Sequence, residues 1–140
     1  MCQPRRPTLR RRRGDAAERI AAGYLERLGW TILGRQLAVG RDELDLLAID
    51  PGPPAVLVVI EVRSNAAAGF GPPEERVDAA KVRRIYRAAA ALVAAGLLPD
   101  GRPLPRLGRR VDLVSVEDAP WLAAGVGGPR IRHLRALRPD

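Results

Sequence analysis

Residues 43–63 read ELDLLAIDPGPPAVLVVIEVR and contain two strand-like runs separated by a structure breaker. The runs cover residues 44–49 and 56–62, and the prolines and glycine at 51–54 prevent a strand or helix from continuing between them. The two runs are therefore expected to form an antiparallel hairpin. The second run shows no polar alternation, which predicts a strand that is buried on both faces at the centre of a sheet.

The rest of the chain predicts helices and strands around this hairpin. Apolar residues spaced by three and four predict a first helix that begins after an N-cap at Asp15 and stops at Gly29. A short strand is expected at 30–33, followed by a polar stretch through Arg41, and a loop at 64–75. A second helix is expected at 76–95, with strands at 110–116 and 131–137. The apolar stripe of the second helix contains Val82, Ile85, Ala89, Leu92 and Val93. The order α-β-β-β-α-β-β predicts one α/β domain, residues 14–140, with a mixed sheet flanked by helices.

The chain of 140 residues carries a formal charge of +8, and its first 13 residues hold much of the basic excess. We expect residues 1–13 to be a basic, disordered tail. Two interpretations of its arginines stay open: a solvated tail, or phosphate contacts that bind nucleic acid through counterion release. The second makes nucleic-acid contacts of Arg10, Arg11, Arg12 and Arg13.

Cysteine content and hydropathy suggest a compartment. The single cysteine, Cys2, rules out an internal disulfide and agrees with a reducing environment, so the cytoplasm is expected. The longest uninterrupted apolar run, 55–60, is too short to span a bilayer. No export signal and no membrane association are expected.

The hairpin brings two acidic residues close together. A turn centred near residues 52 and 53 pairs positions whose numbers sum to about 105 or 106, which sets Asp45 opposite Ile60 or Glu61. In the second register the two carboxylates share a face, with Cβ atoms about 4.5–5.5 Å apart. A slip of one residue would separate them.

Two close carboxylates at the end of an apolar strand repel each other unless a cation or a shared proton compensates. Mg²⁺ takes one or two carboxylates together with water and phosphate oxygens, so Asp45 and Glu61 suit it. Glu43 lies two residues before Asp45 and is a candidate third ligand, while Arg63 could hold a phosphate bidentately. The alternative is an ordinary surface ion-pair network.

Several sequence blocks occur together in a known order. They are Gly14 with Glu18, Ala21 and Tyr24-Leu25; residues 43–47; residues 59–63; Phe70-Gly71, Val77 and Lys81; and residues 110–114 with His133. Over residues 14–137 this order resembles the YraN-like family of uncharacterised bacterial proteins. That family is placed in the PD-(D/E)XK nuclease superfamily and is similar to archaeal Holliday-junction resolvases. The resemblance implies a restriction-endonuclease-like fold.

The resemblance also implies roles for individual residues. Asp45 and Glu61 would hold Mg²⁺ or Mn²⁺, Glu18 would reach the site from the first helix, and position 63 would carry the superfamily's catalytic lysine. Arg63 keeps the positive charge and the phosphate contact, but a guanidinium holds its proton too tightly to act as a base. Lys81, the one lysine of the chain, is a candidate phosphate contact. Further departures from the family pattern are Gln36, Asp42 and Asn65.

Some of these residues also have structural explanations. Glu18 follows Asp15 by three, which is the spacing of a capping box. Asp112 is expected to pair with Arg110 along one strand, and His133 is expected to be structural. Three further arginines form either a solvated helix face or a phosphate-binding surface: Arg83, Arg84 and Arg87.

The sequence thus leads to three hypotheses. The first is a metal-dependent endonuclease-like protein acting on DNA, with branched or single-stranded DNA as candidate substrates and Glu18, Asp45, Glu61 and Arg63 as catalytic residues. The second is a catalytically weakened nucleic-acid-binding module on a nuclease fold, and the third is a protein-interaction adaptor. Branched substrates with two-fold symmetry would suit a homodimer.

Overall fold

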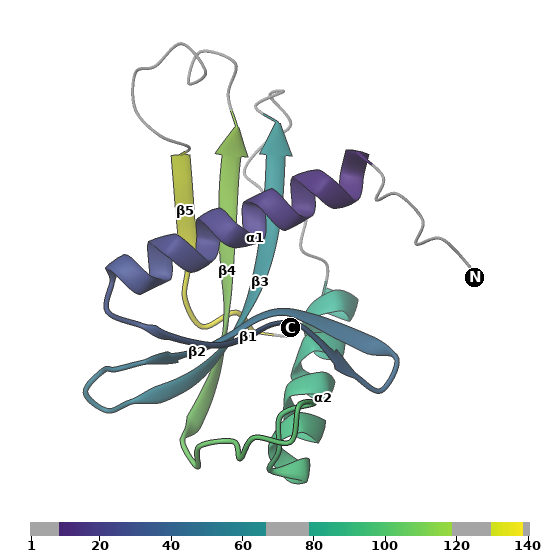
Figure 1. Ribbon diagram of the computed structural model, residues 1–140, viewed down its shortest axis with the longest axis vertical. Coiled ribbons are helices and arrows are strands. Elements are labelled where there is room, and N and C mark those ends of the chain that lie inside the picture. Colours follow the sequence, from purple (N-terminus) through teal and green to yellow (C-terminus); the bar gives the residue numbers. More distant parts are fainter. Residues whose placement is uncertain (1–8, 67–78, 119–129, 139–140) are drawn as a thin grey trace.

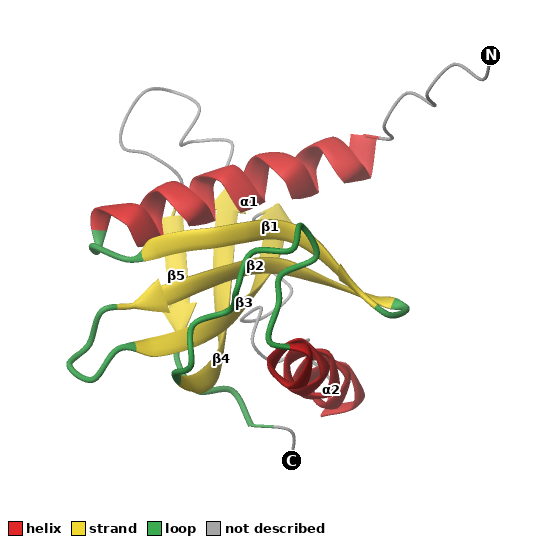
Figure 2. Ribbon diagram, turned by 60° about the horizontal axis from the view of Figure 1, so that its bottom comes forward, coloured by secondary structure: helices red, strands yellow, loops and turns green. Residues whose placement is uncertain are grey.

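A five-stranded mixed sheet lies between two helices in the computed structural model, which describes residues 9–66, 79–118 and 130–138 (Figures 1 and 2). The chain order is α-β-β-β-α-β-β, as the sequence predicts. The elements are α1 (Leu9–Arg27), β1 (Thr31–Val39), β2 (Asp42–Asp50), β3 (Val56–Ala66), α2 (Ala79–Ala95), β4 (Gly108–Asp118) and β5 (Arg130–Leu134). This arrangement is an α/β fold of the restriction-endonuclease-like kind.

The strands are ordered β1-β2-β3-β4-β5 across the sheet. β3 pairs antiparallel with β2 and parallel with β4, and the two outer pairs are antiparallel. The apolar run of β3 therefore occupies the central position, as expected from its lack of polar alternation. A parallel pair needs a crossover connection, and α2 lies in the segment between β3 and β4.

Two apolar clusters form the core, one on each face of the sheet. Val58 and Ile60 of β3 pack into the cluster beneath α1, whereas Leu57 and Val59 pack into the cluster beneath α2. Figure 2 shows the two helices on opposite sides of the sheet. Four apolar residues of the α2 stripe are buried, namely Val82, Ile85, Ala89 and Leu92, but Val93 is exposed. Ala88 is buried in place of Val93, so the predicted stripe is confirmed at four of its five positions.

The start of the first helix was predicted wrongly. α1 begins at Leu9, so residues 9–13 of the expected disordered tail are helical and Asp15 lies inside the helix. Arginine is a good helix former, and a single glycine costs only about 1 kcal/mol, so the basic run continues the helix across Gly14. The expected stop at Gly29 is confirmed, because Gly29 has φ +88° and the Trp30 N–H bonds back to the Leu25 carbonyl.

Strand lengths also differ from the predictions. β1 runs to Val39 through residues expected to be a polar loop, because their backbones pair with β2 across a register shift between Ile32 and Gly34. β3 extends to Ala66, into the start of the expected loop, and β5 ends at Leu134 rather than at 137. Phe70-Gly71 and Val77 lie outside the described residues.

Within the described ranges, no helix combines the length and the apolar character that crossing a membrane requires.

Candidate metal and phosphate site

Asp45 and Glu61 are brought together by the register of β2 and β3. Leu46 pairs with Ile60, so paired residue numbers sum to 106, and continuing this register by one residue sets Asp45 opposite Glu61. The second of the two predicted registers is therefore the correct one. The Val62 N–H donates to Asp45 Oδ2 at 2.8 Å, which fixes the Asp45 carboxylate against β3.

The environment of this pair disfavours two negative charges. Glu61 is only 7% exposed. Burial of Asp45, together with the neighbouring Glu61 charge, raises the pKa of Asp45 to about 7, although the Val62 N–H opposes the shift. Near neutral pH the pair therefore holds a proton for part of the time unless a cation takes its place.

Two basic side chains approach the same oxygen of Glu61. Lys81 Nζ, from the first turn of α2, lies 2.7 Å from Glu61 Oε1, and Arg63 Nε lies 3.6 Å from it. The Arg63 Nε is buried and makes no hydrogen bond within the described part of the chain. Arg63 thus has an unsatisfied donor beside Glu61, although its side chain does not line the cavity between β2 and α2.

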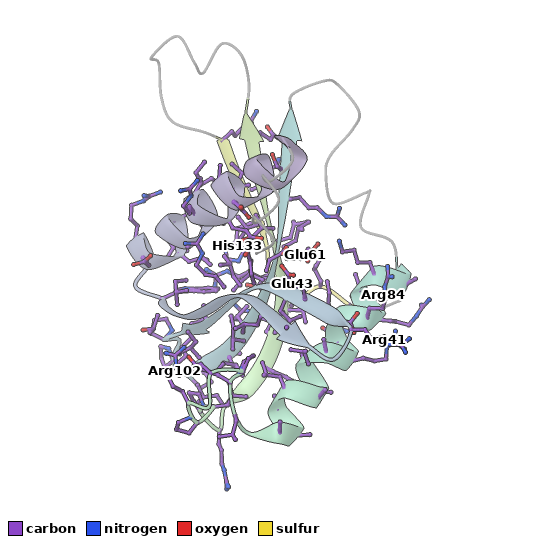
Figure 3. The ribbon with its side chains drawn as sticks, turned by 45° about the vertical axis from the view of Figure 1, so that its right-hand side comes forward. Arg41, Glu43, Glu61, Arg84, Arg102 and His133 are labelled. Carbon is purple, nitrogen blue, oxygen red and sulfur yellow. The ribbon has the colours of Figure 1, made fainter. Side chains whose placement is uncertain are left out.

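A cavity of about 220 Å³ opens beside the pair, between β2 and α2. The residues that line it are Asp42, Glu43, Leu44, Asp45, Glu61, Lys81, Arg84, Ile85 and Ala88. Figure 3 shows Glu43 and Glu61 near one another, with Arg84 on α2 and Arg41 on the same side of the molecule. The cavity therefore has acidic residues along the sheet and basic residues along the helix.

The third predicted metal ligand, Glu43, does not complete a three-ligand site. Glu43 is exposed and lines the cavity, but the described residues contain no group of three or more His, Cys, Asp or Glu side chains that could hold a metal. The protein therefore offers two carboxylates at this place. Two carboxylates still fit Mg²⁺ or Mn²⁺, which keep several water ligands and accept substrate phosphate oxygens.

Glu18 lies near the site, but its carboxylate is hydrogen-bonded to Gln36 of β1. It is nearly buried on α1, and its carboxylate accepts a 2.9 Å hydrogen bond from Gln36 Nε2, which also donates to Asp15. Burial raises the pKa of Glu18, and its charge contributes to the raised pKa of Asp45. The predicted capping box is wrong, because α1 starts six residues before Asp15.

Gln36 was noted from sequence only as a departure from the family pattern. It has φ +49° within β1, and its amide joins Asp15 and Glu18 of α1 to the sheet. No periodicity or motif in the sequence signals this link.

Asp112 and His133 form a separate network. Asp112 is fully buried and accepts two hydrogen bonds from Arg110. It also accepts one hydrogen bond from the Ala136 N–H, and its Oδ2 lies 2.8 Å from His133 Nε2. His133 Nδ1 lies 3.2 Å from the Tyr24 hydroxyl of α1. The predicted Arg110–Asp112 pair is confirmed, and every polar contact given for His133 is internal to the fold.

The other predicted phosphate contacts lie on two helices. Arg83, Arg84 and Arg87 are exposed on α2, where they line a second cavity of about 560 Å³ together with Ala80 and Tyr86. Arg84 lines both cavities, so they adjoin each other at this residue. The backbone of Arg10–Arg13 belongs to α1, but their side chains are outside the description.

A five-stranded mixed sheet between two helices, with Asp45 of β2 beside Glu61 of β3, defines a class, the restriction-endonuclease-like proteins of the PD-(D/E)XK superfamily. A profile of the uncharacterised protein family UPF0102 matches residues 17–116, and the chain belongs to this family.

Relatives of the chain carry the same family designation. A UPF0102 protein of an Arthrobacter species is 36% identical over 124 residues, which cover 89% of this chain and 93% of the relative. A UPF0102 protein of Symbiobacterium thermophilum is 38% identical over 112 residues, covering 80% and 87%. One of Chlorobaculum parvum is 34% identical over 123 residues, covering 88% of each chain.

Proposed function

We propose that this protein is a metal-dependent endonuclease-like enzyme that hydrolyses phosphodiester bonds in DNA in the cytoplasm. The observation that carries the proposal is the pair of the half-buried Asp45 and the nearly buried Glu61, which shares one cavity with Lys81 and has Arg63 beside it. Enzymes arrange burial and like charges in this way where a group must change its protonation or bind a cation.

Each side chain has a defined part in this proposal. Asp45 and Glu61 would hold Mg²⁺ or Mn²⁺, which, when bound, lowers the pKa of water and polarises a phosphate. The guanidinium of Arg63, whose side chain is 33% exposed, would donate to a non-bridging oxygen of the scissile phosphate. Glu18 would act at a distance, by adding negative charge next to Asp45.

The basic surface of α2 supports a nucleic-acid substrate. The helix sequence AAKVRRIYRAAAALVAA holds four basic residues and no acidic one. Arg84 lines both the carboxylate cavity and the cavity that Arg83 and Arg87 line, so adjoining phosphates of one strand could lie along α2. Branched or single-stranded DNA, and a homodimer that binds a two-fold junction, are the finer parts of the proposal.

The test is cleavage of a panel of branched, single-stranded and duplex DNA by the full chain, in EDTA, Mg²⁺ or Mn²⁺. We expect cleavage of at least one structure that requires a divalent metal and is lost in Asp45→Ala. Cleavage that persists in EDTA, or that is unchanged in Asp45→Ala, would contradict the proposal.

A second candidate function is favoured by Arg63 itself. Arginine stands where the family resemblance implies a catalytic lysine, so the protein could bind nucleic acid through α2 without cutting it. This alternative predicts binding that weakens steeply with salt and no turnover in any metal. Arg63→Lys separates the candidates, because cleavage that appears only with lysine shows a competent fold whose natural site binds without cleaving.

A further inference from the structure

Glu61 takes its closest charged partner from α2 rather than from its own strand. The Lys81 Nζ distance of 2.7 Å to Glu61 Oε1 is within hydrogen-bond range, whereas the 3.6 Å to Arg63 Nε is not. Position 81 is 20 residues further along the chain, and α2 packs on the face of the sheet that carries the carboxylate cavity. The fold thus delivers an ammonium group to the carboxylate pair.

The place of Lys81 on α2 is unfavourable for the helix alone. The residue lies in the first turn, which contains no acidic residue, and the positive end of a helix dipole repels a cation there. The Glu61 carboxylate offsets this repulsion. The contact with Glu61 thus gives Lys81 a role in the site.

The residue type also fits the site. Lys81 is the one lysine among 24 basic residues of the chain, so a bias toward arginine has not reached this position. An ammonium is a compact charge with three donors on a flexible stem, whereas a guanidinium is a planar fork that favours bidentate pairing. In a cavity of about 220 Å³, the ammonium can serve Glu61 and leave space for another ligand.

We propose that Lys81 positions the Glu61 carboxylate beside Asp45 and competes with a divalent metal ion for that carboxylate. The inference rests on the proposed function, since competition requires the pair to be a metal site. With a divalent ion held by Glu61, the Lys81 ammonium would turn its donors toward a phosphate in the same cavity. Lys81 is thus a positioning residue that couples metal and phosphate binding.

The experiment is Mn²⁺ binding to the full chain by isothermal titration calorimetry at one pH and salt concentration. Lys81→Gln should bind Mn²⁺ about tenfold or more tightly than wild type, because a positive charge next to the ion has been removed. The matched control is Arg84→Gln, which removes a positive charge from the next turn of α2 and from the same cavity. We expect it to change the affinity by less than about threefold, because exposed charges are screened.

Lys81→Arg distinguishes an effect of charge from an effect of side-chain shape. This variant keeps the charge, so its Mn²⁺ affinity should stay within about threefold of that of wild type. The Lys81 side chain is 35% exposed, so these variants are expected to fold, and thermal melting with Lys81→Ala as a second neutral variant checks this. Equal affinities of Lys81→Gln and Arg84→Gln, or weaker binding by both neutral Lys81 variants, would overturn the role of Lys81 alone. Absence of Mn²⁺ binding in wild type and in Lys81→Gln would contradict the proposed function as well.

Discussion

Replacing Asp45 by asparagine is expected to stabilise the protein at alkaline pH. The folded protein raises the pKa of Asp45 from 3.8 to about 7, so it binds the Asp45 proton more tightly than the unfolded chain does. The protonated Asp45 therefore contributes its full amount to the free energy of unfolding below about pH 4. This contribution is lost as the pH rises through about 7. Asparagine keeps the shape of the side chain and has no proton to lose.

The size of the effect follows from the shift. A change from 3.8 to about 7 corresponds to about 4 kcal/mol of unfolding free energy, and we expect about 2 kcal/mol because water reaches part of Asp45. Asparagine can still accept the Val62 N–H and can donate to Glu61. The variant should therefore be similar to wild type near pH 4 and more stable at pH 8.5.

The assay is urea denaturation of wild type and Asp45→Asn in EDTA at several pH values from 4 to 8.5. The control is Asp50→Asn: burial raises the pKa of Asp50, but hydrogen bonds from the Gly52 N–H and Arg110 outweigh burial, so the pKa is lowered. Its difference from wild type should stay constant between pH 5 and 8.5. A difference for Asp45→Asn that does not grow with pH, or a variant that is less stable at pH 8.5, would refute the reasoning.

Two other predictions concern the buried network and the basic helix. Asp112→Asn should lower the unfolding free energy by about 2 kcal/mol at pH 7, because Arg110 loses the fully buried one of its two carboxylate partners and keeps Asp50. Equal urea midpoints for variant and wild type would contradict this. Because the pKa of Asp112 is lowered, wild type should lose this contribution only below about pH 4. Arg87→Gln should reduce the slope of log affinity for DNA against log salt by about one, measured by fluorescence anisotropy. Arg19→Gln, exposed on α1, is its control, and an equal change in both would disprove a specific role for α2.

The sequence predicted the centre of the fold and the carboxylate pair. A proline-rich turn and an apolar run are local features, and together they limit the hairpin to two registers. The two registers differ by one residue in the position of the turn, which the sequence does not determine. The observed sum of 106 was therefore among the predictions but could not be selected from sequence.

The failed predictions depend on long-range contacts or on weak local preferences. The β1 residues after Leu33 look like a loop because glycine and polar residues interrupt the alternation, yet pairing with β2 makes them a strand. The contact between Lys81 and Glu61 depends on how α2 packs against the sheet, which periodicity does not encode. The helical start at Leu9 depends on arginine propensity, which the absence of an apolar stripe conceals.

The most direct test of the central claim is the single-turnover cleavage rate in Mn²⁺ of wild type, Glu61→Gln and Glu43→Gln. Both variants remove one carboxylate from the same cavity, but only Glu61 is nearly buried beside Asp45. If the pair is the metal site, Glu61→Gln should lose about 100-fold or more in rate, while Glu43→Gln stays within about threefold. Equal losses in the two variants, or undiminished cleavage by Glu61→Gln, would contradict this assignment of the metal site.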